Sequence, residues 1–341
     1  MGIAHTLQDE LTALEDALET ALHKAGPLPL YSMVRYFFGH EDAAGNAVRM
    51  PVGKRLRSAL LLRIAHELGG SDAALDLAVA VELFHNFTLI HDDIEDNDEL
   101  RRGRPTVWAR WGVAHGINAG DATAFLANEY LLQAAARGKE GLAAATYLNA
   151  RFREVAEGQY RDFVLAETPL DAAGVSVEAY LEMIRQKSAV LIGGSTAAGA
   201  LVTGQSREVE QALYRYGESL GMAYQIADDL ASLWGEEADT GKRPFGDLIE
   251  RKKTYPVLYG IAHGATTVAT HYADKVVVTA AAAAQLAEEL VAVGAFEASK
   301  ALLREHVEEA REALAGVMVP HKLAATLLEL IDVLVVVPQR T

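Results

Sequence analysis

The sequence contains no cysteine. A disulfide framework, a thiolate zinc site and a cysteine nucleophile are therefore excluded, and we expect a cytoplasmic protein in a reducing compartment. Residues 1–22 have neither a basic start nor an uninterrupted apolar core, so we do not expect a signal peptide. The most apolar late stretch, residues 327–337, is short and contains Glu329 and Asp332. It is too short to cross a bilayer, so no membrane span is expected.

Positive charge is also scarce. The chain has 31 Lys and Arg against 47 Asp and Glu, and its formal net charge is −16. This balance argues against a nucleic-acid partner. An anionic substrate would have to bind at local clusters of basic residues, so the positions of Lys and Arg are informative.

Strand patterns are almost absent, whereas apolar residues recur at helical spacing along most of the chain. We therefore predict one all-α domain over residues 1–341, a bundle of about ten or more helices. The predicted helices are 7–24, 56–69, 72–100, 118–136, 142–166, 176–202, 206–235, 253–264, 272–293, 296–315 and 320–336.

An acidic cluster is followed closely by a basic one in residues 89–108. Asp92, Asp93 and Asp96 share one side of a predicted helix. Arg101 and Arg102 follow, and we expect the helix to end in the stretch from Gly103 to Pro105. Carboxylates suit Mg²⁺, which often shares its coordination with substrate phosphates, and arginine suits phosphate oxygens. The alternative is a solvated, charged helix face.

Two elements before this cluster carry further polar residues. Lys54 and Arg57 lie three apart at a predicted helix start, where Gly53 and the helix N-terminus favour an anion. They could equally be ordinary exposed side chains of a first turn. His85 points along the acidic face of its helix; the alternative is a hydrogen-bonded core residue.

A second acidic and basic segment occupies residues 223–256 and repeats the order of the first. Asp228 and Asp229 lie late in an apolar helix, and a Gly-rich loop and several Lys and Arg residues follow. If the two acidic helices pack side by side, their carboxylates would form a cage for several Mg²⁺ ions and a diphosphate. Between the segments, Lys187 and Ser188 precede an apolar run. This lysine is either a snorkelling surface residue or a charged partner for a bound molecule.

In these motifs the chain resembles the trans-isoprenyl diphosphate synthases, the polyprenyl synthetase family, from about Tyr31 to Tyr259. The matching elements are GKRLR at 53–57, DDIED with RRGRPTVW, GQYRD at 158–162, the pair at 187–188, Gln225 with Asp228, GK at 241–242 and DLIERKKT at 247–254. The resemblance implies an isoprenoid synthase-like helical bundle around a central cavity, and a homodimer for which residues 118–136 are a candidate interface.

The resemblance also implies a role for each matching residue. Asp92 and Asp96 would bind two Mg²⁺ ions and Asp228 a third, supported by Asp93 and Asp229. Isopentenyl diphosphate and an allylic diphosphate (dimethylallyl, geranyl or farnesyl) would be the substrates. The allylic diphosphate would be bound by Arg101, Lys187, Lys242 and Lys252, and isopentenyl diphosphate by Lys54, Arg57, His85 and Arg102. The developing allylic cation would be surrounded by Lys187, Ser188 and Gln225.

Three positions depart from the family pattern. Ser232 stands where a third aspartate is usual, Ser188 replaces a threonine, and Ser58 replaces a common proline. The first aspartate of the second motif, Asp228, is present, so we expect activity to be retained.

Aromatic residues just before the first motif suggest a limit on product length. At about 1.5 Å per residue, Phe87 lies roughly 7–8 Å below Asp92 and Phe84 about 12 Å. Rings at these depths would close an apolar well, so we expect products of fifteen to twenty carbons. Phe87 with small Thr88 is similar to the archaeal geranylgeranyl pattern, which favours twenty carbons over fifteen. The alternative is that both phenylalanines are plain core residues.

Two other functions fit parts of the pattern. Ser232 would suit a non-catalytic partner subunit, but the other motif aspartates are present. A class I terpene cyclase would share the all-α metal cage, but the second segment lacks an N-x₃-S-x₃-E pattern. A short-chain Mg²⁺-dependent prenyltransferase is therefore the leading prediction.

Overall fold

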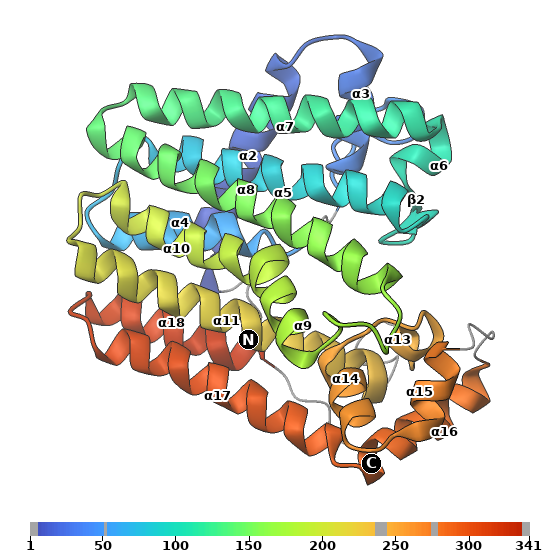
Figure 1. Ribbon diagram of the computed structural model, residues 1–341. Coiled ribbons are helices and arrows are strands. Elements are labelled where there is room, and N and C mark those ends of the chain that lie inside the picture. The colour runs from blue at the N-terminus through green and yellow to red at the C-terminus, as the bar shows by residue number, and fades with distance from the viewer. Residues whose placement is uncertain (1–5, 51–52, 236–243, 274–278, 336–341) are drawn as a thin grey trace. The chain divides into compact units, whose positions relative to one another are not determined.

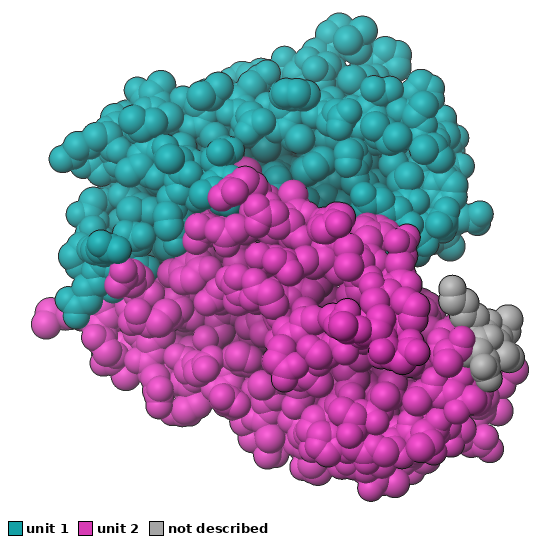
Figure 2. All heavy atoms as spheres, viewed as in Figure 1, with its two compact units in different colours: residues 1–150, 195–210, 319–323 teal, residues 151–194, 211–318, 324–341 magenta. Residues whose placement is uncertain are grey.

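The computed structural model describes residues 6–50, 53–235, 244–273 and 279–335 (Figure 1). Helices make up most of this part of the chain, which confirms the predicted all-α class. The chain divides into two compact units, coloured separately in Figure 2. Unit 1 contains residues 1–150, 195–210 and 319–323, and unit 2 contains the rest. The expectation of a single domain stays a prediction.

Unit 1 is built around α5 (Ala74–Glu95), which packs against α2, α4 and α7. Because α5 is covered on several sides, it buries apolar residues on most of its faces, as the sequence indicates for a central helix. The other elements that lie wholly in this unit are α2 (Gln8–Lys24), α3 (Pro29–Phe37), α4 (Leu56–Glu67), β1 (Leu100–Arg101), β2 (Arg104–Pro105), α6 (Val107–Trp111) and α7 (Val113–Ala136).

Unit 2 contains two clusters of buried apolar side chains. One of them joins α9, α11, α14 and α17, and the other joins α14, α15 and α16. The elements within this unit are α9 (Val177–Ile184), the π-helical turn η1 (Arg185–Ala189), α13 (Gly246–Ile249), α14 (Tyr255–Ala262), α15 (Thr266–Ala273), α16 (Ala280–Ala292) and α17 (Ala295–Ala315). Four helices have residues in both units: α8 (Lys139–Glu167), α10 (Val190–Leu201), α11 (Arg207–Trp234) and α18 (His321–Leu334).

The predicted end of the first acidic helix is wrong. α5 stops at Glu95 and Asp96 is its C-cap, because Asn97 adopts a left-handed conformation with φ 57°. Asparagine is one of the few residues that tolerates this conformation and so ends helices. Gly103 and Pro105 therefore do not end the helix. They belong to a short antiparallel hairpin of β1 and β2.

Other helices also differ from the sequence prediction. The helix expected over 176–202 is divided by η1, and that expected over 272–293 corresponds to the end of α15 and to α16, with 274–278 outside the described residues. The short helices α3 and α6 lie outside the ranges predicted to be helical. None of the helices in the described residues is both long enough and apolar enough to cross a membrane.

Candidate active site

The two adjacent aspartates of the first motif have different surroundings. Asp92 is half-buried, whereas Asp93 is only 1% exposed. The Asp93 Oδ1 accepts a hydrogen bond from Arg101 Nε at 2.5 Å, and its Oδ2 is buried with no hydrogen-bond partner in the part of the chain that the structure describes. Burial raises the pKa of Asp93 to about 6, against the opposing charge of Arg101. The outer aspartate, Asp92, can therefore reach a ligand, and the inner aspartate, Asp93, orients Arg101.

The hairpin separates the two arginines that follow the motif. Arg102 and Gly103 form its turn with φ of 53° and 73°, positive at both central residues as in a type I′ turn. Arg101, on β1, turns to Asp93, whereas the guanidinium of Arg102 lies against Gly53, where an added Cβ would be 3.0 Å from Nη2. The two arginines thus turn toward different segments of unit 1: Arg101 toward the acidic motif and Arg102 toward the GKRLR segment.

The hairpin is fixed in place by α3. Tyr36 donates its hydroxyl to the Pro105 carbonyl at 2.9 Å, and the Arg104 guanidinium lies 4.0 Å from the centre of the Tyr36 ring. Trp108 donates its indole N–H to the Asp98 carbonyl. These contacts explain why the RRGRPTVW segment needs its particular residues after the acidic motif.

The three basic residues of GKRLR are not equivalent. Arg55 has a left-handed conformation, with φ 49°, immediately before α4 and is 5% exposed. Its guanidinium binds Glu15 and Glu82, both at 2.8 Å. Ser58 donates a hydrogen bond to Glu82 at 3.0 Å, which gives the serine at this position a structural role. Arg55 therefore anchors the segment, and Lys54 and Arg57 remain the candidates for phosphate binding.

We expect Glu82→Gln to destabilise unit 1. Arg55 holds the pKa of buried Glu82 at about 2 although burial alone would raise it. The pKa of Glu82 in the folded protein lies below its unfolded value of 4.5. The pairing therefore stabilises the fold fully above pH 4.5, and this stabilisation is lost as the pH falls toward 2. Breaking a buried ion pair costs roughly 3–5 kcal/mol, and the lower end applies because Arg55 keeps Glu15. Urea unfolding at pH 7 measures this loss.

The matched control for this experiment is Glu15→Gln, which removes the more exposed partner of the same arginine. The Glu15 side chain is 30% exposed, so its loss should cost about 1 kcal/mol or less. Equal losses in the two variants would contradict the anchoring role of the buried pair.

His85 contacts the basic segment from α5. Its Nε2 lies 3.2 Å from Arg57 Nη1, and because arginine can only donate, the imidazole nitrogen accepts. Burial, and then the charge of Arg57, lowers the pKa of His85 to about 3. A neutral His85 therefore holds Arg57, which agrees with the predicted pairing of the two residues at one phosphate site.

The aromatic residues before the motif form a row along α5. The ring centroids of Phe84 and Phe87 are 5.6 Å apart, and those of Phe87 and His91 are 4.9 Å apart. His91 in turn lies against Gly120 of α7, where an added methyl group would overlap its ring. Thr88 donates its hydroxyl to the His85 carbonyl. Phe87 is thus held between two rings, while its predicted effect on product length stays a prediction.

In unit 2 the adjacent aspartates of the second motif repeat the contrast of the first. Asp228 is half-buried, and Asp229 is 3% exposed. Asp229 accepts hydrogen bonds from the Tyr180 hydroxyl and from Gln225 Nε2. Burial, with the nearby charge of Asp247, raises the pKa of Asp229 well above its usual value. Asp229 is therefore suited to hold Gln225 in place. No pattern in the sequence indicates that Tyr180 is a partner of Asp229.

The predicted cation-stabilising residues come together in unit 2. Ser188 donates its hydroxyl to Gln225 Oε1 at 3.2 Å. Lys187 Nζ lies 2.6 Å from Asp162 Oδ2 on α8. Lys187 and Ser188 both lie in η1, and π-turns in α-helices are frequent at functional sites.

The other basic residues of the second segment differ in what they contact. Lys252 pairs with Glu250 at 2.9 Å on the surface, and Lys253 donates to the carbonyls of Leu165, Ala166 and Thr168 at the end of α8. Lys253 is thus a helix cap. Lys242, predicted to bind the allylic diphosphate, lies outside the described residues. The Ser232 hydroxyl accepts a hydrogen bond from the backbone of Asp247, so the unusual serine helps to position α13.

The donor set of the two motifs fits a hard divalent cation. All candidate ligands are carboxylate oxygens, which Mg²⁺ prefers, and Asp93 Oδ2 of the first motif has no hydrogen-bond partner among the described residues. Within the described residues, no three His, Asp or Glu side chains converge closely enough to hold a metal alone. Mg²⁺ usually keeps water and substrate phosphates among its ligands, so one or two carboxylates of a single motif can be enough for an ion.

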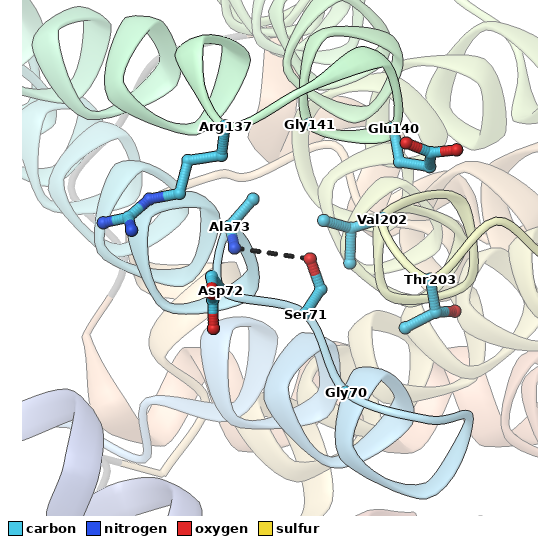
Figure 3. A pocket seen from close by; sticks show the side chains of 9 residues that line it. All are labelled: Gly70, Ser71, Asp72, Ala73, Arg137, Glu140, Gly141, Val202 and Thr203. Carbon is cyan, nitrogen blue, oxygen red and sulfur yellow. Dashed lines mark hydrogen bonds between the residues drawn. The ribbon is translucent and has the colours of Figure 1, made fainter.

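A polar cavity of about 300 Å³ lies in unit 1 and contains none of the predicted site residues (Figure 3). Arg137, Glu140 and Ser71 are among its lining residues. The loop of residues 70–73, which precedes α5, lines the cavity. This loop lies at the opposite end of α5 from Asp92, about 30 Å away along the helix axis. The cavity is therefore separate from the acidic motif.

Comparison with known proteins identifies the class. A model of the polyprenyl synthetase family matches residues 42–292. The chain belongs to this family, as its motifs predict. It is 37% identical to the (2E,6E)-farnesyl diphosphate synthase of Mycobacterium tuberculosis H37Rv, over 97% of this chain and 90% of that protein. It is 38% identical to the geranylgeranyl diphosphate synthase of the same organism, over 74% of this chain and 72% of that protein.

Solved structures agree with the family assignment. The chain superimposes on the crystal structure of a polyprenyl synthetase from Streptomyces coelicolor A3(2) with a TM-score of 0.89. The two sequences are 33% identical, and the match covers 98% of this chain and all of the other. The isoprenoid synthase-like fold expected from the sequence is thereby confirmed.

Proposed function

We propose that this protein is a short-chain trans-prenyltransferase that condenses isopentenyl diphosphate with an allylic diphosphate, most readily to geranylgeranyl diphosphate. The observation that carries the proposal is the repeated arrangement of the two motifs. In each, an outer aspartate is half-buried at its helix surface and an inner one is buried and bonded to a neighbouring side chain. Relatives carry both farnesyl and geranylgeranyl names, so the fifteen-carbon product is the alternative.

The basic residues would bind and orient the two diphosphates. Lys54, Arg57 and His85, together with Arg102, are proposed to hold isopentenyl diphosphate, with Arg57 oriented by His85. Arg101, Lys187, Lys242 and Lys252 are proposed to hold the allylic diphosphate. Because arginine and lysine carry fixed charge, they stabilise the negative charge that develops on the leaving group.

Asp92, Asp96 and Asp228 would hold Mg²⁺, with Asp93 and Asp229 in supporting roles. When bound, Mg²⁺ would neutralise the charge of the departing diphosphate. The Ser188 hydroxyl and the Gln225 amide, linked at 3.2 Å, would present dipoles to an allylic cation, together with the Lys187 carbonyl. The alkene of isopentenyl diphosphate would then attack, which extends the chain by one five-carbon unit. The released diphosphate would accept the proton, so no protein base is needed.

Phe87→Ala is expected to lengthen the products by one or more five-carbon units. The Phe87 ring is held between Phe84 and His91, so removing it opens space along α5 below Asp92. Chromatography of the dephosphorylated products measures the change. Phe87→Leu serves as a graded control and should give a smaller shift. A product spectrum identical to wild type would make Phe87 an ordinary core residue.

The same product assay tests the proposed length for the unmodified protein. With dimethylallyl or geranyl diphosphate as primer, we expect products to accumulate at twenty carbons. Accumulation at fifteen carbons would establish the alternative, and chains beyond twenty-five carbons would contradict the short-chain proposal.

We also propose that the protein is a cytoplasmic homodimer that associates through α7. This helix exposes large apolar side chains along one side, namely Val113, Ile117, Phe125 and Leu132. Exposed apolar surface of this extent is typical of an interaction site.

A further inference from the structure

The π-turn η1 sets the direction of two proposed site residues. It joins α9 to α10 and includes Lys187 and Ser188. A π-turn contains more residues than an α-turn, so it rotates the side chains after it relative to a continuous helix. Such turns are rare, and neighbouring contacts must stabilise this one.

α8 provides one of these contacts through Gly158. A Cβ built on Gly158 would lie 2.7 Å from the Cα of Lys187 and 2.7 Å from the carbonyl carbon of Gln186, closer than real Cβ atoms approach. The backbones of α8 and η1 therefore touch at this point. Glycine lowers helix stability, so its place within the 29-residue α8 requires such a close approach.

α11 provides the second contact through Gly221. A Cβ there would lie 2.6 Å from the Cα of Ala189, the last residue of η1. Like Gly158, Gly221 lies well inside a long helix, which extends over 28 residues. The turn is thus held between two glycines from two different helices.

One helical turn beyond each glycine, a polar side chain binds a side chain of η1. Asp162, four residues after Gly158, pairs with Lys187 at 2.6 Å. Gln225, four residues after Gly221, accepts a hydrogen bond from Ser188 at 3.2 Å. Residues four apart share a helix face, so on each helix the glycine and the polar side chain both face η1. The glycine contacts the backbone of η1, and the polar side chain bonds to a side chain of η1.

We propose that Gly158 and Asp162 of α8 and Gly221 of α11 are positioning residues for the reaction. The glycines let α8 and α11 pack directly against η1, and this packing orients Lys187 and Ser188 toward the allylic substrate. The inference rests on the proposed roles of Lys187 and Ser188. It predicts a selective defect, because the groups proposed for isopentenyl diphosphate belong to the GKRLR segment, α5 and the hairpin, and none of them is part of η1, α8 or α11.

The test is steady-state kinetics of Gly158→Ala and Gly221→Ala, with each substrate varied in turn. We expect kcat to fall roughly 10- to 100-fold, as for small misplacements of reacting groups, and the KM for the allylic substrate to rise. The KM for isopentenyl diphosphate should stay unchanged. The control is Gly316→Ala at the C-terminal end of α17, where the atom nearest to the added methyl group, the Glu312 carbonyl oxygen, is at the ordinary contact distance of 3.6 Å. It should behave as wild type.

Wild-type kinetics in both folded variants would overturn the inference, as would equal increases in the two KM values. Thermal unfolding establishes that each variant is folded. If a glycine variant does not fold, Asp162→Asn leaves the backbone contact intact and should still raise the KM for the allylic substrate alone. An unchanged allylic KM in that variant would also overturn the inference. An inactive wild-type protein would instead contradict the proposed function.

Discussion

Asp92→Ala should remove most turnover while leaving the fold intact. The Asp92 carboxylate is half-buried near the end of α5, where it is proposed to hold Mg²⁺ against the allylic diphosphate. Removing a group that stabilises transition-state charge lowers kcat by roughly 10²- to 10³-fold. The free energy of unfolding should change little, since the side chain is not part of the core. Rates of product formation and urea unfolding of the same preparation test both expectations.

Glu95→Ala is the matched control for Asp92→Ala. Glu95 is exposed on the last turn of the same helix and has no proposed role in the reaction. Its removal takes one negative charge from the same surface and should leave kcat near the wild-type value. If Asp92→Ala kept near-native rates, or if the two variants lost activity equally, the assignment of Asp92 as a metal ligand would be wrong.

In the second motif, Asp228→Ala and Asp229→Ala should differ in their effect on stability. Asp228→Ala should lower kcat by roughly 10²- to 10³-fold with an almost unchanged free energy of unfolding. Asp229 is buried and accepts hydrogen bonds from Tyr180 and Gln225. Its loss leaves buried polar groups without a partner, which costs about 1–3 kcal/mol in addition to activity.

Comparing the two variants separates metal binding from positioning. Each variant removes one carboxylate from neighbouring positions of α11, so a general electrostatic effect would change the two variants in the same way. We expect only Asp229→Ala to be destabilised in urea. Equal stabilities would mean that the hydrogen bonds of Asp229 do not hold this part of α11 together.

The acidic motifs were predictable because their spacing on a helix is a local property. Asp92 and Asp228 each lie late in an apolar helical pattern, and the chemistry of carboxylates and arginines suggests their function without knowledge of the fold. The sequence could not show which residue of each pair is buried. That depends on the partners Arg101 and Tyr180, and Tyr180 lies 49 residues from Asp229 along the chain.

The hairpin and the π-turn were missed for a different reason. Residues 100–105 contain no alternating apolar pattern, and the hairpin is held by contacts with α3. Residues 176–202 read as one continuous helix, because a π-turn adds a residue without interrupting the apolar pattern. The importance of Gly158 and Gly221 appears only when their neighbours are known.

The basic residues of GKRLR illustrate the same limit of local patterns. Lys54, Arg55 and Arg57 have similar chemistry, and the sequence favoured Lys54 and Arg57 on their spacing at a helix start. In the structure α4 begins at Leu56, and Arg55 turns inward to Glu82. Its burial is decided by a glutamate on α5, a partner that lies 27 residues away along the chain.

The central claim is Mg²⁺-dependent chain elongation, and one assay tests it directly. Purified protein is incubated with labelled isopentenyl diphosphate and each allylic primer, first after chelation of divalent metal and then with Mg²⁺ restored. We predict prenyl diphosphate product only when Mg²⁺ is present, carrying one or more added five-carbon units. No elongation with any primer, release of hydrocarbon in place of a diphosphate, or an undiminished rate after chelation would contradict the claim.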